Sequence, residues 1–84
     1  MKLYKEALRS FFSGYVSALR RRRGLTQEEM AERLRITGRA YSDLERGIYC
    51  FSAVALVFLL LMLEEHEISS LREEIAKVED REVA

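Results

Sequence analysis

Apolar residues recur every three or four positions along most of the chain, which is the spacing of amphipathic α-helices. Between Leu3 and Leu19 these positions cover nearly half of the helix circumference. A stripe this wide predicts a helix that contacts more than one surface. Ser13 and Gly14 interrupt it, because glycine costs about 1 kcal/mol inside a helix and serine is a common N-cap. Residues 1–12 therefore either continue the first helix or form a separate helical arm.

The ends of the next helices are marked by capping residues. Four arginines at 20–23 and then Gly24 end the first helix, because cations favour the negative end of the helix dipole and glycine accepts a positive φ. Thr26 begins TQEE, a capping box that starts a second helix over about 27–34. After a very short corner, Thr37 caps a third helix that runs through GRAYSDLER to Gly47.

Two more helices complete the pattern. Ser52 caps a fourth helix that extends to Leu63, and Ser70 with Glu73 forms a capping box for a fifth over about 70–80. The fifth helix carries a narrow apolar stripe of Leu71, Ile75 and Val78. With no proline and four glycines, the composition suits helices joined by tight corners. The chain is therefore expected to be one all-α domain over residues 1–84, a compact bundle of five helices.

The fourth predicted helix contains the most apolar run, IYCFSAVALVFLLLML at residues 48–63. A bilayer span needs about 20 apolar residues, and sixteen cover only about 24 Å of a hydrocarbon core about 30 Å thick. One face is enough for the protein core and consists of Ala53, Leu56, Leu59, Leu60 and Leu63.

A second apolar face of that helix lies about 150° away and consists of Val54, Val57, Phe58 and Leu61. Leaving it in water would forgo on the order of 6–10 kcal/mol per chain. A two-fold dimer buries such a face against its own copy. We therefore expect a homodimer whose interface combines this face with the stripe of the fifth helix, that is Leu71, Ile75 and Val78.

Charge and candidate chemistry narrow the function. Residues 1–47 carry eleven Lys and Arg against six Asp and Glu, whereas residues 48–84 carry three against eight, which suggests a basic working face. Cys50 is the only cysteine, so a disulfide within the chain and a cysteine-based zinc site are excluded and a reducing cytosol is favoured. His66 has no second histidine or cysteine at ligand spacing. We expect a cytoplasmic protein with no cofactor, no metal and no enzymatic activity.

The second and third helices have the pattern of a helix-turn-helix. Ala31 is small where the two helices cross, Ile36 is apolar in the corner, and Tyr41 and Leu44 face the core. The stretch LTQEEMAERLRITGRAYSDLERG closely resembles the Cro and phage-repressor type of helix-turn-helix, the XRE family, over about Val16 to Leu63. The resemblance implies a five-helix fold whose third helix, about 38–46, reads double-stranded DNA at a palindromic operator.

The family's functional residues carry over by position. The resemblance implies an ion pair between Arg20 and Glu45 and a phosphate contact from Gln27. The DNA-facing side of the third helix would consist of Thr37, Gly38, Arg39, Ser42 and Asp43. Arg39 is expected to carry most of the base specificity, because a guanidinium can bind O6 and N7 of guanine together.

One departure from the family concerns the corner between the second and third helices. Arg35 occupies the position that is usually glycine, and a non-glycine residue at positive φ costs roughly 1 kcal/mol. The preferred interpretation is a homodimeric transcriptional regulator, a repressor with no small-molecule effector. Two alternatives remain: a protein-interaction module or antitoxin with the same fold, and a membrane-tethered regulator anchored by residues 48–63.

Overall fold

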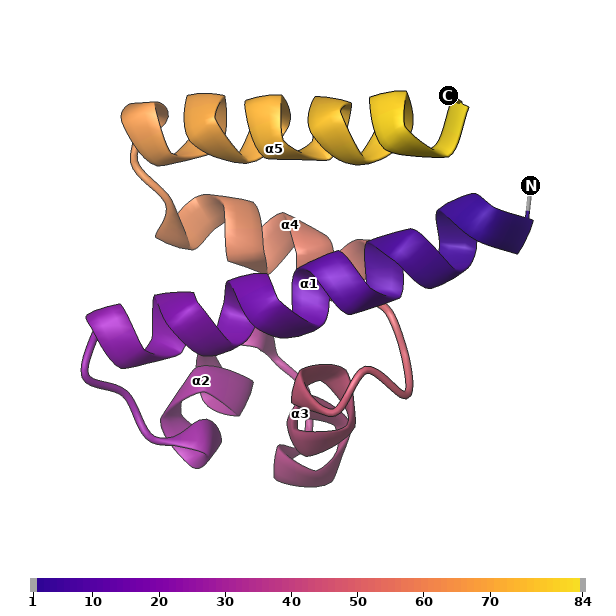
Figure 1. Cartoon of the computed structure of the whole chain (residues 1–84). Helices are drawn as coiled ribbons and strands as arrows, with labels where there is room; N and C mark the ends of the chain where they lie inside the picture. The colour runs from indigo at the N-terminus through magenta and orange to yellow at the C-terminus, as the bar shows by residue number, and fades with distance from the viewer. Residues whose placement is uncertain (1, 84) are drawn as a thin grey trace.

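The computed structural model describes residues 2–83 of the chain and the side chains of residues 4–81. Within that range the chain forms five helices and no strand: α1 (Lys2–Arg22), α2 (Gln27–Leu34), α3 (Gly38–Glu45), α4 (Ala53–Met62) and α5 (Glu65–Val83). The predicted all-α fold with a helix-turn-helix is confirmed. Figure 1 shows α2 and α3 on one side of α1 and α5 on the other. Met1 and Ala84, the ends of the predicted domain, lie outside the described residues.

The core is built from every helix. Each helix contributes apolar residues spaced by three, four or seven positions, so that one face of each points inward. The buried cluster consists of Phe12, Val16, Leu19, Met30, Ala31, Leu34, Tyr41, Leu44, Leu59, Leu63 and Leu71.

Three predicted capping residues begin helices in the structure. The hydroxyl of Thr26 accepts a hydrogen bond from the amide of Glu29 at 3.1 Å, and the Glu29 carboxylate accepts one from the Thr26 amide at 2.9 Å. Thr37 caps α3 in the same way by accepting from Ala40, and Ser52 caps α4. Each of these bonds satisfies a backbone N–H that has no partner within its own helix.

The first helix is continuous through Ser13 and Gly14, so residues 2–12 extend α1 and do not form a separate arm. Ser13 is not an N-cap. Its hydroxyl donates a hydrogen bond to the backbone carbonyl of Glu45, at the end of α3. This carbonyl has no partner within its own helix, so Ser13 closes the end of α3 from a neighbouring element.

The fifth helix begins earlier than predicted, and the predicted capping box is wrong. Ser70 and Glu73 lie inside α5, which starts at Glu65. The start is satisfied instead by the carboxylate of Glu67, which accepts a hydrogen bond from the amide of Glu64 at 3.0 Å. A glutamate three residues into a helix can therefore satisfy the helix start without the serine or threonine half of a capping box.

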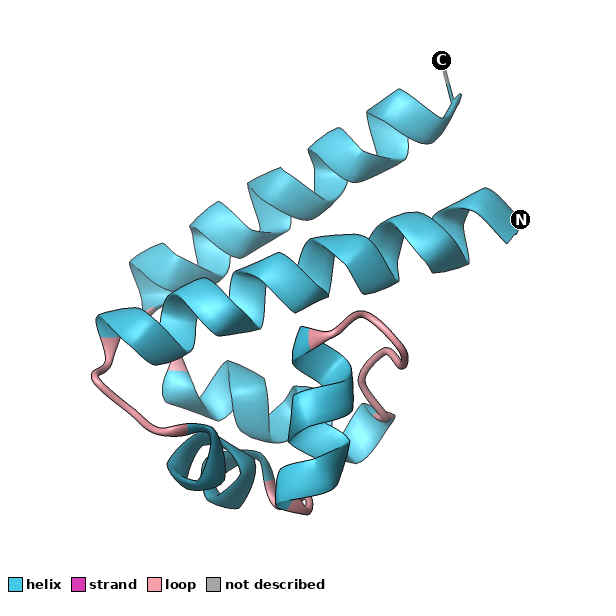
Figure 2. Ribbon diagram, turned by 60° about the horizontal axis from the view of Figure 1, so that its bottom comes forward, coloured by secondary structure: helices cyan, strands magenta, loops and turns pink. Residues whose placement is uncertain are grey.

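The apolar stripe of α5 is covered within the chain. Figures 1 and 2 show α5 running back alongside α1 in the opposite direction. Leu71 and Val78 are only 4% and 2% exposed, and Ile75 is partly buried against the same core. The expectation that this stripe flanks a dimer interface is therefore corrected, because the wide apolar stripe of α1 already covers it.

The fourth helix buries most of the predicted face. Leu59 and Leu63 are buried and Leu56 packs against the core, as predicted. Ala53 and Leu60 were predicted wrongly, because they are exposed and Ala55 is buried instead. Three of the four residues of the predicted second face remain at the surface, since Val54, Val57 and Leu61 are 63%, 53% and 74% exposed. The fourth, Phe58, is half-buried. Among the described residues, no helix is both long enough and apolar enough to cross a membrane.

Candidate nucleic-acid interface

The helix-turn-helix has the predicted packing. Ala31, Tyr41 and Leu44 are buried, and Ile36 packs against the core from the corner. Arg35 adopts the left-handed conformation at φ 62°, as expected from the family's glycine at this position. The amides of Arg35 and Ile36 donate hydrogen bonds to carbonyls in the last turn of α2, so the helix ends at Arg35. The corner thus sets α3 against α2 in the arrangement that presents a recognition helix.

The outer side of α3 is open to solvent. Thr37, Gly38 and Arg39 are exposed, and Ser42 and Asp43 are half-buried. Figure 2, in which α2 and α3 come forward, shows this side of the molecule. All five predicted residues therefore lie in the first two turns of α3 and its cap, the part of a recognition helix that enters the major groove.

Arg46 is a charged neighbour that the sequence reasoning did not single out. Its guanidinium lies 3.8 Å from the carboxylate of Asp43, at i,i+3 spacing. The adjacent cation reduces the field of the Asp43 carboxylate, so the pair would weaken its repulsion of a nearby anion. The spacing of Asp43 and Arg46 is the sequence signal that could have revealed it.

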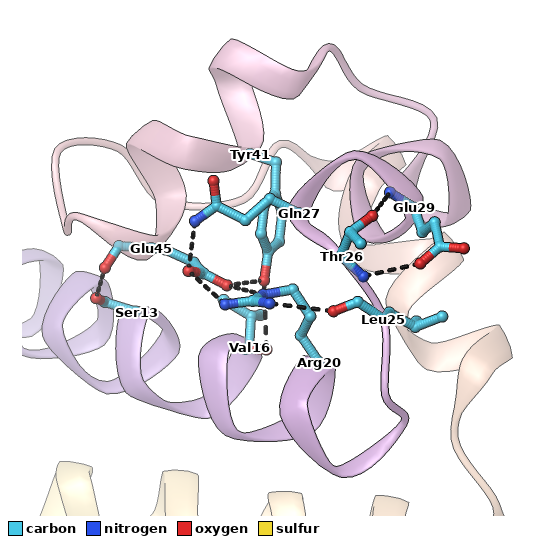
Figure 3. Close-up of polar contacts among 9 residues, drawn as sticks. All are labelled: Ser13, Val16, Arg20, Leu25, Thr26, Gln27, Glu29, Tyr41 and Glu45. Carbon is cyan, nitrogen blue, oxygen red and sulfur yellow. Dashed lines mark hydrogen bonds and ion pairs between the residues drawn. The ribbon is translucent and has the colours of Figure 1, made fainter.

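A polar network behind α3 holds this helix in place (Figure 3). The predicted ion pair is present: Nε of Arg20 lies 2.7 Å from Oε2 of Glu45, and the two side chains are 16% and 11% exposed. Arg20 also donates to the carbonyl of Leu25 at 3.0 Å. The hydroxyl of Tyr41 donates to the Glu45 carboxylate and lies 3.3 Å from the Val16 carbonyl. The end of α3 is therefore attached to α1 through several bonds.

Gln27 joins this network at the first residue of α2. Its side-chain amide donates to Oε1 of Glu45 at 2.9 Å, which links the start of α2 to the end of α3. A glutamine side chain carries two N–H groups, so this bond leaves a second donor for a phosphate. The structure thus places Gln27 at an exposed helix N-terminus, where backbone amides and the helix dipole also favour an anion.

The charge state of the network is set by its hydrogen bonds. Burial alone would raise the pKa of Glu45, but donors from Arg20, Tyr41 and Gln27 outweigh it and hold this pKa below its ordinary value. Burial, followed by the hydrogen bond to Glu45, raises the pKa of Tyr41. Glu45 is therefore ionised and Tyr41 neutral at physiological pH, which keeps one charge of each sign in the Arg20–Glu45 pair.

The arginine run at the end of α1 does more than cap the helix. Arg23 donates to Glu67 at 2.8 Å and to the carbonyl of Met62 at 3.0 Å, so it ties α1 to α4 and α5. Arg22 lies 3.6 Å from the same Glu67 carboxylate and is more exposed. Arg20 and Arg23 therefore hold the tertiary structure, Arg22 adds a more exposed ion pair, and Arg21 faces solvent.

The fold and this outward-facing helix define a DNA-binding protein of the helix-turn-helix class. A model of the family described as helix-turn-helix matches residues 16–64, more than half of the chain. The chain belongs to this family, in its Cro/C1 or XRE type, whose members are DNA-binding transcriptional regulators. Comparison with curated proteins and with solved structures gave no match.

The family match covers the end of α1 and all of α2, α3 and α4. It begins at Val16 within α1 and ends at Glu64, between α4 and α5. The first four turns of α1 and all of α5 lie outside it, and these two segments pack against each other. The packing of α5 against the first turns of α1 therefore lies outside the matched region.

Proposed function

We propose that the protein is a sequence-specific transcriptional regulator, a repressor that binds a palindromic operator as a homodimer. The observation that carries the proposal is an exposed outer side of α3 whose inner side is held by the Glu45 network. A helix positioned this firmly can present side chains to base edges without losing further conformational freedom on binding. Occupation of an operator by two such helices excludes other proteins from the same DNA, and this requires no additional domain.

The side chains divide into base and phosphate contacts. Arg39, exposed on the second residue of α3, is the proposed reader of a guanine. Thr37, Gly38, Ser42 and Asp43 line the same side, and Asp43 is paired with Arg46. Gln27 is the proposed phosphate contact, which fixes the orientation of the domain and carries no sequence information.

The outer face of α4, defined by Val54, Val57 and Leu61, supports the homodimer. The exposed fractions of these three residues add up to nearly two whole side chains. At about 1.5–3 kcal/mol per fully buried side chain, burying them would stabilise a dimer by roughly 3–6 kcal/mol from each chain. Association costs about 4–15 kcal/mol, so the expected dimer is of moderate strength and forms most completely on its operator.

Selection of bound sequences from a random DNA pool tests the DNA-binding half of the proposal. The expected result is a palindrome whose half-sites are about one helical turn apart, because the two recognition helices of a dimer read successive major grooves. Failure to enrich any sequence would contradict sequence-specific regulation and favour the protein-interaction alternative.

Substitution of Arg39 then tests the recognition helix. Arg39→Ala should weaken binding to the selected site by about 1–3 kcal/mol and binding to random DNA much less, because it removes a base contact and leaves the phosphate contacts. Arg72→Ala is the matched control, since Arg72 is exposed on α5, on the opposite side of the molecule from α3. Equal losses on both DNAs would make Arg39 a phosphate contact.

A further inference from the structure

The outer face of α4 is flanked by two different edges. Toward the helix-turn-helix, the ring of Phe58 is partly covered by the guanidinium of Arg35, which lies 5.1 Å from the ring centroid. The other edge has two half-exposed apolar residues, Leu60 on α4 and Ile68 on α5. The face therefore lies between the α2–α3 corner at one edge and α5 at the other.

The direction of α4 constrains how a second copy can meet this face. Figure 1 shows α2 and α3 on one side of the molecule and α5 on the other, with α4 running across between them. In a dimer on a palindrome, the two-fold axis passes through the DNA between the half-sites. That axis therefore runs from the α2–α3 side toward the α5 side, and α4 lies across it. A two-fold axis across a helix reverses the direction of that helix in the second copy.

We propose that the two α4 helices of the dimer pack antiparallel, with Val54 of each chain against Leu61 of the other. The midpoint of Val54 and Leu61 falls beside Val57, so the two Val57 side chains meet at the axis. In this register each outer residue meets an apolar partner that is also mostly exposed, since Val54 is 63% and Leu61 74% exposed. Such self-complementarity is what a two-fold interface requires. The proposal rests on the homodimer proposed above and specifies its partner and geometry.

Disulfide cross-linking tests this register directly, once the exposed Cys50 has been replaced so that it cannot cross-link. In a Cys50→Ser background, Val54→Cys and Leu61→Cys chains are oxidised separately and as a mixture, and the products are separated on a non-reducing gel. In the antiparallel register two Val54 positions are about 10 Å apart along the helices, beyond the Cα separation of about 7 Å that a disulfide tolerates. The mixture should therefore give about tenfold more cross-linked dimer than either chain alone.

The control chain carries Ser10→Cys, an exposed position on α1, and should not cross-link with either variant. If Val54→Cys and Leu61→Cys each cross-link with themselves and not with each other, the helices are parallel and the register is overturned while the dimer stands. If no combination cross-links and light scattering of the unmodified chain gives the mass of one chain, the homodimer itself is overturned.

A second readout connects the register with DNA. The oxidised mixed dimer should retain at least the affinity of the reduced protein for the selected palindrome, because the axis already faces the DNA and the cross-link removes the association step. Loss of binding on oxidation, reversed by a reductant, would show that this α4 contact is incompatible with the DNA-bound dimer and would overturn the proposed geometry.

Discussion

Replacing Glu45 with alanine removes one acceptor shared by three side chains. Gln27 is exposed, and its amide can hydrogen-bond to water after the substitution. Arg20 is different, because its side chain is mostly covered and would retain only its bond to the Leu25 carbonyl. The hydroxyl of Tyr41 lies 3.3 Å from the Val16 carbonyl and so keeps an acceptor. The stranded guanidinium of Arg20 is therefore the main source of destabilisation.

The magnitude follows from the burial of the pair. Removing one partner of a buried ion pair costs about 3–5 kcal/mol, whereas an exposed pair contributes less than about 1 kcal/mol. At 16% and 11% exposure, Arg20 and Glu45 lie nearer the buried limit, so we expect a loss of about 2–3 kcal/mol. For a domain of this size 1 kcal/mol shifts Tm by about 4–8 °C, which predicts a decrease on the order of 10–20 °C.

Thermal unfolding followed by far-UV circular dichroism measures this effect. Glu32→Ala is the matched control, because Glu32 is exposed on α2 and its removal leaves the network intact. A Tm of Glu45→Ala within 2–3 °C of the Glu32→Ala value would refute the reasoning, since it corresponds to less than about 1 kcal/mol. In a double-mutant cycle with Arg20→Ala, a coupling energy near zero would likewise show that the two side chains do not act as a pair.

Three further outcomes are expected. The pKa values of Glu45 and Glu67 are held below their ordinary values, so the stabilisation they give is present above the unfolded-state pKa of about 4.3 and is lost as pH falls through the folded-state pKa. Tm should therefore drop in acid, and it should drop less in Glu45→Gln. The same dependence of Tm on pH in Glu45→Gln and in the unmodified chain would contradict this. Arg35→Gly should melt about 4–8 °C above Arg35→Ala, because only glycine adopts φ 62° without strain, and equal Tm values would argue against strain at this corner. Leu61→Glu should convert a two-chain mass in light scattering to a one-chain mass with an unchanged far-UV spectrum, and a persistent dimer would exclude the outer face of α4 as its interface.

The helix-turn-helix was predictable from sequence because its signals are local. Thr26, Thr37 and Ser52 each satisfy a backbone amide only three residues away, so the start of a helix is visible in four consecutive residues. The left-handed corner at Arg35 came from the resemblance to the family, as did the Arg20–Glu45 pair. The residues proposed to face DNA were assigned in the same way, and in the structure they lie together on the outer side of α3.

Other features could not be predicted, because they depend on partners far away along the chain. Ser13 had the sequence pattern of an N-cap, yet its hydroxyl closes the end of α3, 32 positions away. The start of α5 was not predicted, because Glu64 and Glu67 directly follow the apolar run and look like the polar residues that end the fourth helix. Their hydrogen bond is local, but Arg23 fixes the Glu67 carboxylate from α1.

The choice between two apolar stripes belongs to the tertiary structure. The sequence specifies that the α5 stripe with Leu71 and Val78 and the α4 face with Val54 and Leu61 both require cover, because hydrophobic burial depends on area removed from water. It does not specify which of the two is buried within the chain, since hydrophobic burial has no directional preference and either stripe could pack against α1. In the folded chain the long α1 meets α5, whose length matches it, and the outer face of α4 is left at the surface. Capping and helix periodicity are therefore encoded within a few residues, whereas the surface available to a second copy is decided only when all five helices have packed.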